Sequence, residues 1–399
     1  MKTATKALAG LAVVLSTVSG TLASTDIEQI RSYSLAEAAA EYDAINVANA
    51  SNIKVAVQVQ ARYKYNKRDN ASTTLTLPDD DTTIGFDLRR TKVAISGDVT
   101  ENMNGKLQFA FDRRTGMAAL EDAVLKWTVS DDLTIHIGQF KPGVLREELV
   151  SSKQQLTAER SATNETFNQD YTQGIEFGFG GDQWRATISF NDGFGADNTA
   201  FNSASEADYG VSARAEFLVG DGEFGQFKQF TSFRGSNAGG MIGIAAHHQS
   251  MGDTNPSAAS STEMTTLTGD FSWVDDGWNF FVAGVWRSMD AGAATIDDTG
   301  LVVQGGFFAS DSDEIFARYS AVFAGSDNGP GSDQDYSDLT VGWNHYIVPE
   351  SHAAKFTLQG TYSFDATTTG IVSTSDGHNL LPDSEDGQFG IIAQLQFLF

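Results

Sequence analysis

From Ile53 to the end of the chain, apolar and polar residues alternate along one segment after another. In residues 53–65 the apolar side chains occupy the odd positions, whereas most even positions carry Lys, Gln or Arg. Successive side chains of a β-strand point to opposite faces, so such a segment has one apolar and one polar face. The alternation predicts an all-β chain, although alone it would also fit a soluble sandwich of two sheets.

Sixteen segments follow this pattern, with boundaries uncertain by about 2–4 residues. Short turns such as Ser130-Asp131-Asp132 alternate with longer loops that are acidic or rich in Gly, Ser and Asn, as is typical of transmembrane barrels. Residues 220–240 are long where a short turn is expected, and we interpret them as a surface excursion. The predicted strands are 53–66, 84–97, 105–113, 121–129, 133–140, 171–180, 183–191, 207–219, 240–250, 263–274, 277–288, 300–309, 312–323, 337–347, 352–365 and 386–399.

The two ends of the chain indicate an outer-membrane destination. Residues 1–23 have an early basic part, an apolar stretch and a small-residue end, which is the pattern of a secretory signal peptide. The final strand ends in Phe399 and thereby resembles the signal read by the barrel assembly machinery of bacterial outer membranes. In lipid a sheet must close, because unpaired backbone groups find no water there. We therefore predict a transmembrane antiparallel β-barrel of 16 strands over residues 53–399, with its apolar face outward.

Residues 24–52 precede the barrel and are predicted to lie in the periplasm. They are the one part of the mature chain where apolar residues recur at helical spacing, so they could form a short amphipathic helix. This segment would act either as a tether or as a trimerising element. It is too short to be a globular plug.

The chain is strongly acidic, with 26 Lys and Arg residues against 52 Asp and Glu residues and a net charge of −26. Much of the negative charge falls in the predicted external loops. Cysteine is absent, which excludes disulfides and thiolate metal sites. We expect no cofactor and no metal ion.

The early strands, in contrast, place basic side chains on the polar face. A ladder of Arg and Lys in a pore selects anions by Coulomb attraction and hydrogen-bond donation. The second strand is ambiguous, because Val93 and Ile95 put Arg90 inward whereas Phe86 and Leu88 contradict that parity. The candidate anion-binding residues of the lumen are Arg62, Arg90, Lys92, Lys106 and Lys126.

A long connection, residues 141–170, follows the fifth strand and is predicted to be the third external loop. A loop in that position can fold into the lumen and narrow it. Lys141, Lys153 and Arg160 are then the candidates for contact with the permeating ion. The alternative is an exposed loop whose mixed charges pair with one another.

Several motifs of this region resemble a known family. Residues 86–97 contain a paired arginine and end in Ser-Gly, and they are followed in order by Gly138-Gln-Phe-Lys-Pro142, Leu145-Arg-Glu-Glu148, Ser151-Ser-Lys153 and Glu159-Arg-Ser161. The set is similar to the phosphate-selective porin O and P family. The resemblance implies a trimer of sixteen-stranded barrels, an inward-folded third loop and an arginine ladder leading to a phosphate or polyphosphate site.

The sequence therefore predicts an outer-membrane porin for passive diffusion of small solutes, with a preference for anions. A general or weakly cation-selective porin is the alternative within this class, and an outer-membrane enzyme or adhesin barrel is the alternative outside it. No catalytic motif is recognisable, so we expect no enzyme activity. The expected partners are small inorganic anions, outer-membrane lipid and lipopolysaccharide, the barrel assembly machinery and two further copies of the chain, and we expect no nucleic acid.

Overall fold

A computed structural model describes residues 53–69, 82–201, 203, 207–251, 262–290, 294–328, 334–367, 371–372 and 377–399. The predicted signal peptide, residues 1–23, and the predicted periplasmic segment, residues 24–52, lie outside these described residues. Within them, no helix is both long enough and apolar enough to span a bilayer.

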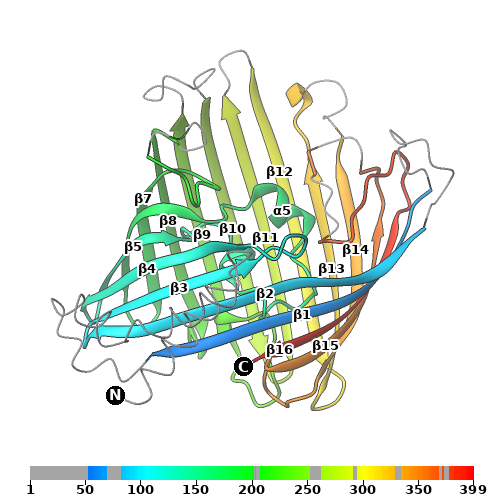
Figure 1. The fold of residues 1–399 in the computed structure, drawn as a ribbon, viewed down its shortest axis with the longest axis horizontal. Coiled ribbons are helices and arrows are strands. Elements are labelled where there is room, and N and C mark those ends of the chain that lie inside the picture. The colour runs from blue at the N-terminus through cyan, green and yellow to red at the C-terminus, as the bar shows by residue number, and fades with distance from the viewer. Residues whose placement is uncertain are drawn as a thin grey trace, which may run out of the picture.

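The described residues form a closed antiparallel barrel of sixteen strands, which confirms the predicted fold class (Figure 1). Each strand pairs with its neighbours in the sequence, and β1 closes the sheet by pairing with both β2 and β16. The strands are β1 Lys54–Lys67, β2 Thr82–Thr100, β3 Met103–Phe111, β4 Ala118–Ser130, β5 Leu133–Phe140, β6 Thr172–Gly180, β7 Trp184–Asn191, β8 Tyr209–Gly220, β9 Gly239–Met251, β10 Thr262–Asp275, β11 Trp278–Asp290, β12 Thr295–Phe308, β13 Asp313–Phe323, β14 Tyr336–Tyr346, β15 Ala354–Ser363 and β16 Phe389–Leu398.

The polar face of the sheet is buried inside the barrel and the apolar face is exposed, which is the reverse of a soluble protein. In β1, Gln60 and Arg62 are fully buried, whereas Val55 is 53% exposed. The same division runs through β16, where Gln394 and Gln396 are buried. A polar interior and an apolar exterior are what a sheet in lipid requires.

Among the register shifts of the described sheet, two are β-bulges that place two consecutive charged residues on the polar side, and the first of these explains the ambiguous second strand. Gln60 of β1 is opposite Arg90, but Ala61 is opposite Leu88, so Arg89 is an extra residue in β2. A bulge places two residues of one strand against one residue of its partner. Phe86 and Leu88 therefore keep their outward parity, and both Arg89 and Arg90 are directed to the polar side.

The second bulge has the same effect in β4. Gln108 of β3 is opposite Asp122 and Phe109 is opposite Leu120, which leaves Glu121 as the extra residue. Glu121 and Asp122 consequently both reach basic side chains of the polar side. Two consecutive arginines on β2 thus have a counterpart in two consecutive carboxylates on β4.

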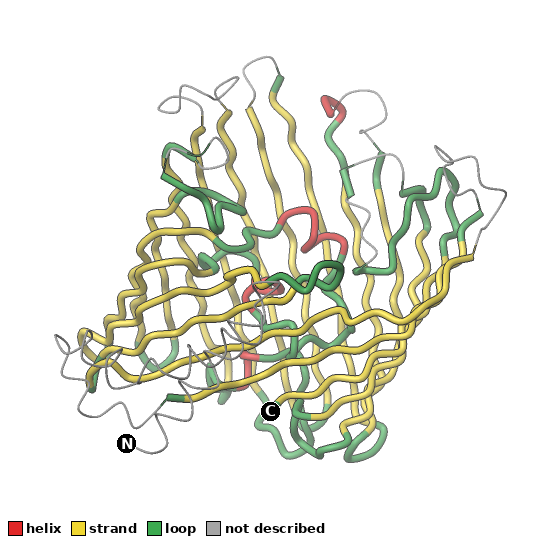
Figure 2. Tube along the Cα trace, in the orientation of Figure 1, coloured by secondary structure: helices red, strands yellow, loops and turns green. Residues whose placement is uncertain are grey.

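Residues 141–171, between β5 and β6, contact the polar faces of strands from several sides of the barrel. They contain two short helices, α4 (Arg146–Leu149) and α5 (Ala162–Phe167), which Figure 2 shows in red between the walls of the sheet. Arg62 of β1 donates to the carbonyl of Ala158, and Lys355 of β15 donates to the carbonyl of Gln155. The hydroxyl of Thr163 in α5 donates to carbonyls of β12 and β13.

Apolar side chains fix this segment to one side of the barrel only. Val144, Leu145 and Phe167 form a buried cluster with residues of β9, β11, β13 and β14, and Val150 and Leu156 form a second one with residues of β11, β12 and β13. The space between residues 141–171 and strands β2–β8 is lined instead by charged residues, as described below.

The long connection between β8 and β9 is not the surface excursion that the sequence suggested. It contains a single 3-10 turn, η1 (Gln226–Lys228), and its residues Phe227 and Phe230 are buried. Phe230 belongs to the second of the two apolar clusters. The prediction was wrong because these rings find apolar partners that the local pattern does not reveal. Phe230 packs against residues 141–171 and the inward side of β11, and Phe227 packs with Met241 of β9 and Val274 of β10.

Candidate functional site: a basic path through the barrel

Three adjoining cavities follow one side of the barrel between residues 141–171 and the wall. The outer cavity, of about 460 Å³, lies against β2 and β3. The middle cavity, of about 380 Å³, and the inner cavity, of about 410 Å³, continue along β3–β8 to the turns after β4 and β6. Consecutive cavities share lining residues, and Lys141 lines all three. The cavities therefore form one path, with Lys141 at its centre.

A single carboxylate holds three arginines at the outer end of this path. Glu159 forms ion pairs with Arg62 and Arg89 at 2.6 Å and with Arg90 at 2.7 Å. His378, from the connection between β15 and β16, lies 3.4 Å from the same carboxylate. Arg62 and Glu159 are buried, whereas the Arg89 side chain is partly exposed and lines the outer cavity.

The electrostatics of this cluster leave it with excess positive charge. Burial tends to raise the pKa of Glu159, but Arg89, Arg90 and Arg62 together hold that pKa well below its usual value. Burial lowers the pKa of His378 to about 3, so its imidazole is neutral at physiological pH. Three guanidinium charges therefore face one carboxylate charge.

Where the outer and middle cavities adjoin, the bulge in β4 supplies a carboxylate to each of two lysines. Lys92 contacts Glu121 at 2.6 Å, and Lys106 contacts Asp122 at 2.7 Å. The Tyr171 ring lies 4.4 Å from the amino group of Lys141, a cation–π contact. These contacts give the middle cavity an alternating set of positive and negative groups.

Lys141 is buried among charged neighbours. Its amino group forms an ion pair with Glu148 of α4 and lies 3.7 Å from Asp170. Burial, and after it the charge of Arg160, lower the pKa of Lys141 to about 7. Its charge therefore changes within the physiological pH range.

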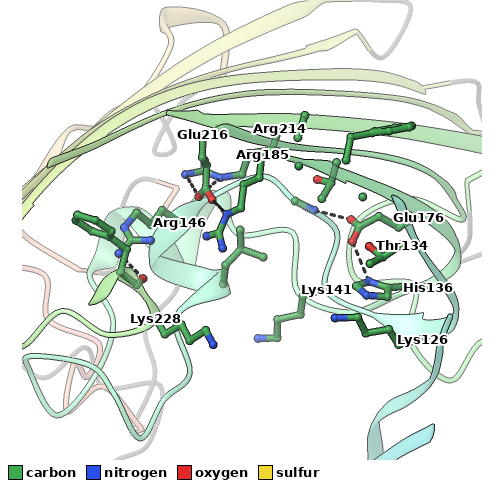
Figure 3. Close-up of a pocket in the computed structure, with 18 of the residues that line it drawn as sticks. Lys126, Thr134, His136, Lys141, Arg146, Glu176, Arg185, Arg214, Glu216 and Lys228 are labelled. Carbon is green, nitrogen blue, oxygen red and sulfur yellow. Dashed lines mark hydrogen bonds and ion pairs between the residues drawn. The ribbon is translucent and has the colours of Figure 1, made fainter. Parts of the chain in front are cut away.

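The inner cavity combines paired and unpaired cations (Figure 3). Arg185 and Arg214 both contact Glu216, and His136 contacts Glu176. Lys126, Lys141 and Lys228 also line the cavity and lie along its lower side in the view, below these pairs. Within the described part of the chain, no ion pair involves Lys126 or Lys228.

The lining of the path has more basic than acidic residues, whereas the whole protein has more acidic than basic residues. Its lining contains 12 of the 26 Lys and Arg residues but only 10 of the 52 Asp and Glu residues. The basic members are Arg89, Arg90, Lys92, Lys106, Arg113, Lys126, Lys141, Arg146, Arg160, Arg185, Arg214 and Lys228. A highly acidic chain thus presents a slightly basic lining to a solute inside the barrel.

Six of the eight residues proposed from the sequence line this path, namely Arg90, Lys92, Lys106, Lys126, Lys141 and Arg160. The other two lie outside its lining. Arg62 is buried behind the outer cavity and holds residues 141–171 in place through Glu159 and Ala158. Lys153 lines none of the three cavities, and its carbonyl accepts a hydrogen bond from Gln396.

Sequence reasoning missed several basic members of the lining as site residues. Arg89 could have been found, because the conflict between Leu88 and Val93 is the signal of a bulge. Arg185 and Arg214 have the inward parity of their strands. Arg146 and Lys228 lie on irregular segments, where no periodicity indicates direction.

The site shows no feature of a metal centre. Within the described ranges, no group of three or more His, Cys, Asp or Glu side chains is arranged to hold a metal ion.

Comparisons with known proteins agree with this architecture. The model of the family "Phosphate-selective porin O and P" matches residues 55–369. No individual curated protein sequence matches the chain.

Similar solved structures include an anion-selective porin from Comamonas acidovorans, with 11% sequence identity and a TM-score of 0.60 over 87% of this chain and 99% of that chain. The outer-membrane channel DcaP of Acinetobacter baumannii has 11% identity and a TM-score of 0.56, over 87% and 97% of the two chains. A trimer form of OmpT of Vibrio cholerae has 14% identity and a TM-score of 0.55, over 87% and 99%. At such low identity these structures support the fold, whereas the family match covers most of the sequence. The chain belongs to the phosphate-selective porin O and P family and is a channel protein of the bacterial outer membrane.

Proposed function

We propose that the channel prefers anions and that small inorganic anions such as phosphate pass along the three cavities. The excess of basic over acidic residues in their lining, in a chain with twice as many acidic as basic residues, carries this proposal. Arginines suit phosphate because the guanidinium offers paired donors in a plane. The family name and the anion selectivity stated for the Comamonas acidovorans porin support the same reading.

In this proposal residues 141–171 are an external loop folded inward, and they constrict the pore. Their contacts with β1, β8, β13 and β15 support that placement. The candidate binding residues are Arg90, Lys92, Lys106, Lys126, Lys141 and Arg160, with Arg62 as a positioning residue, and Arg89 joins them. Lys153 is withdrawn from direct contact with the ion, because it lies outside the lining.

Reversal potentials in planar lipid bilayers test the proposal. In a KCl gradient the wild-type channel should favour chloride, and added phosphate should reduce the chloride current by competing for the path. Lys141→Glu should lower the ratio of anion to cation permeability by about twofold or more, because it reverses a charge at the narrow centre. The control Lys67→Glu changes an exposed residue of β1 that lines none of the three cavities. Preference of the wild-type channel for potassium would refute the proposal.

A general porin with weak selectivity is the second candidate, and the pairing of the lining favours it. Lys92, Lys106, Arg160 and Arg185 each contact a carboxylate, so part of their charge is already compensated. Weak selectivity would appear as an anion preference that phosphate does not diminish. The two candidates are therefore separated by the phosphate competition in the same bilayer experiment.

We further propose that the channel is a homotrimer and that its assembly uses the barrel assembly machinery. The trimer form of the Vibrio cholerae protein supports the first point. The terminal Phe399, whose backbone pairs with Val57 of β1 where the barrel closes, supports the second. The acidic external loops would face lipopolysaccharide, with divalent cations between the two sets of anionic groups.

A further inference from the structure

The connection between β8 and β9, residues 221–238, shares a core with residues 141–171. The guanidinium of Arg146 donates to the carbonyl of Phe227 at 2.7 Å, and the amide of Phe230 donates to the carbonyl of Gln154 at 3.2 Å. The Phe230 ring lies 4.7 Å from the ring of Phe281 on β11. Two segments that leave the barrel wall at opposite ends of the strands are therefore packed against each other.

The same connection is also tied to the far wall. The hydroxyls of Thr231 and Tyr346 lie 2.8 Å apart, and Gln229 lies 3.0 Å from the imidazole of His352. Arg234 donates to the carbonyl of Phe308 at 2.8 Å. The segment is therefore attached to β12 through Phe308, to β14 through Tyr346 and to the turn before β15 through His352.

Lys228 is an exposed residue between two buried aromatic residues of this segment, Phe227 and Phe230. Its neighbour Phe227 is buried, whereas the Lys228 side chain lines the inner cavity together with Lys126 and Lys141 (Figure 3). A charged group that is not paired acts on a passing ion with its full field, and a narrow low-dielectric path strengthens that field. Lys228 therefore has the position and the chemistry to contact an ion that leaves the inner cavity.

We propose that residues 221–238 form a second constriction, at the end of the barrel where the short turns lie, and that Lys228 on this constriction selects for anions. The claim that Lys228 selects anions rests on the proposed function, whereas the claim that residues 221–238 narrow the pore does not. The pore would thus be limited by two segments in series, residues 141–171 from one end and residues 221–238 from the other.

The first test reverses the charge of Lys228. Lys228→Glu should lower the anion-to-cation permeability ratio by about twofold relative to the wild-type channel in a KCl gradient. Lys54→Glu is the matched control, since Lys54 is an exposed lysine at the same end of the barrel and lies outside the three cavities. An equal effect of both substitutions, or no effect of Lys228→Glu, would overturn the role of Lys228. Because this test compares variants with the wild type, it gives an answer even if the wild-type channel proves cation-selective.

The second test removes the segment. Gly220 and Gly239 are directly opposite each other in the register of β8 and β9, so an Asn-Gly turn can replace residues 221–238. The shortened channel should show a larger single-channel conductance and admit larger neutral sugars in liposome swelling. Unchanged conductance and an unchanged size limit in a folded, heat-modifiable barrel would overturn the second constriction. If the shortened chain fails to fold, Lys228→Cys with a bulky thiol reagent decides instead, because blockage of the current requires Lys228 to lie in the path.

Discussion

Arg89 and Arg90 reach the same carboxylate from one strand because a bulge turns both side chains inward. In a regular strand one of them would face lipid, where a guanidinium is strongly unfavourable. The bulge therefore doubles the positive charge that β2 contributes at this height of the barrel. Both arginines line the outer cavity, and Arg89 is the more accessible of the two.

Substitution of Arg89 is expected to weaken anion passage without loss of the fold. Arg89→Ala leaves Glu159 with two arginine partners, so the buried carboxylate stays compensated. The anion-to-cation permeability ratio should fall by about twofold in reversal-potential measurements. Arg68→Ala, which removes a partly buried arginine just after β1 that lines none of the three cavities, should leave the ratio unchanged.

The pH dependence of selectivity is expected to follow Lys141. Burial lowers its pKa to about 7, so the amine gains its proton, and its charge, as the pH falls. The anion preference should therefore increase as the pH is lowered from about 8.5 to about 5.5. Lys141→Arg should remove this dependence, because a guanidinium stays charged throughout that range. A His136→Gln channel, which lacks the nearby histidine of the inner cavity, should retain it. A flat pH profile in the wild-type channel would contradict the assignment.

Among the elements of the fold, the sequence predicts the strands well and the irregular segments between them poorly. All sixteen strands were predicted, because each has one side in lipid and one in a polar interior, and this contrast leaves a period of two. Residues 221–238 were misread, since a segment that packs against another segment has no such contrast. For the same reason parity placed Arg90 and Lys92 correctly but gave no position for Arg146, Lys153 or Lys228.

Glu159 supplies the ion pairs that attach residues 141–171 to β1 and β2, in addition to the hydrogen bonds that the segment accepts from β1. Glu159→Ala would leave Arg62, Arg89 and Arg90 together without a carboxylate. Breaking a buried ion pair in this way costs about 3–5 kcal/mol, and here three charges are left. We expect the segment to detach from β1 and β2, to become sensitive to protease in detergent and to increase the noise of the single-channel current.

A control and a rescue make this expectation specific. Glu165→Ala removes a half-buried carboxylate of α5 that contacts only His378 among the ion pairs of the described residues, and its effect should be much smaller. Phosphate at high concentration should protect the Glu159→Ala channel from protease, because the anion can take the place of the missing carboxylate. Protection of the wild-type and variant channels to the same extent would contradict this explanation.

For the molecule as a whole, the interior is divided into a packed side and an open side. Apolar clusters fill the space next to β9–β14, and the charged cavities lie next to β2–β8. The packed side gives the inner segments a rigid support, and the open side leaves room for a solute. Family membership indicates the transport class, and the proposed function places the passage of the solute on the open side of this division.

The outer face of β2 is the region where we expect contact between copies of the chain. Ile84, Phe86 and Leu88 are all highly exposed, and Phe86 reaches 89%. Because hydrocarbon already surrounds these side chains, contact with a second copy would gain van der Waals packing rather than hydrophobic burial, and projecting side chains offer the largest surface for such packing. Phe86→Ala should therefore reduce the fraction of trimer on unheated gels and in native mass spectrometry. The control Phe307→Ala changes an exposed phenylalanine of β12, and an equal loss of trimer in both variants would contradict this location.

Because of the bulges, the number of charged side chains inside this channel can change when β2 or β4 becomes one residue shorter. Deleting one codon at Arg89 or Glu121 would restore strict alternation and remove one inward charge, while every outward residue would keep its place in the bilayer. An ordinary insertion in a strand exchanges its two faces and destroys the wall. At these two positions, a gain or loss of one residue instead becomes a tolerated step by which related channels can diverge in ion preference.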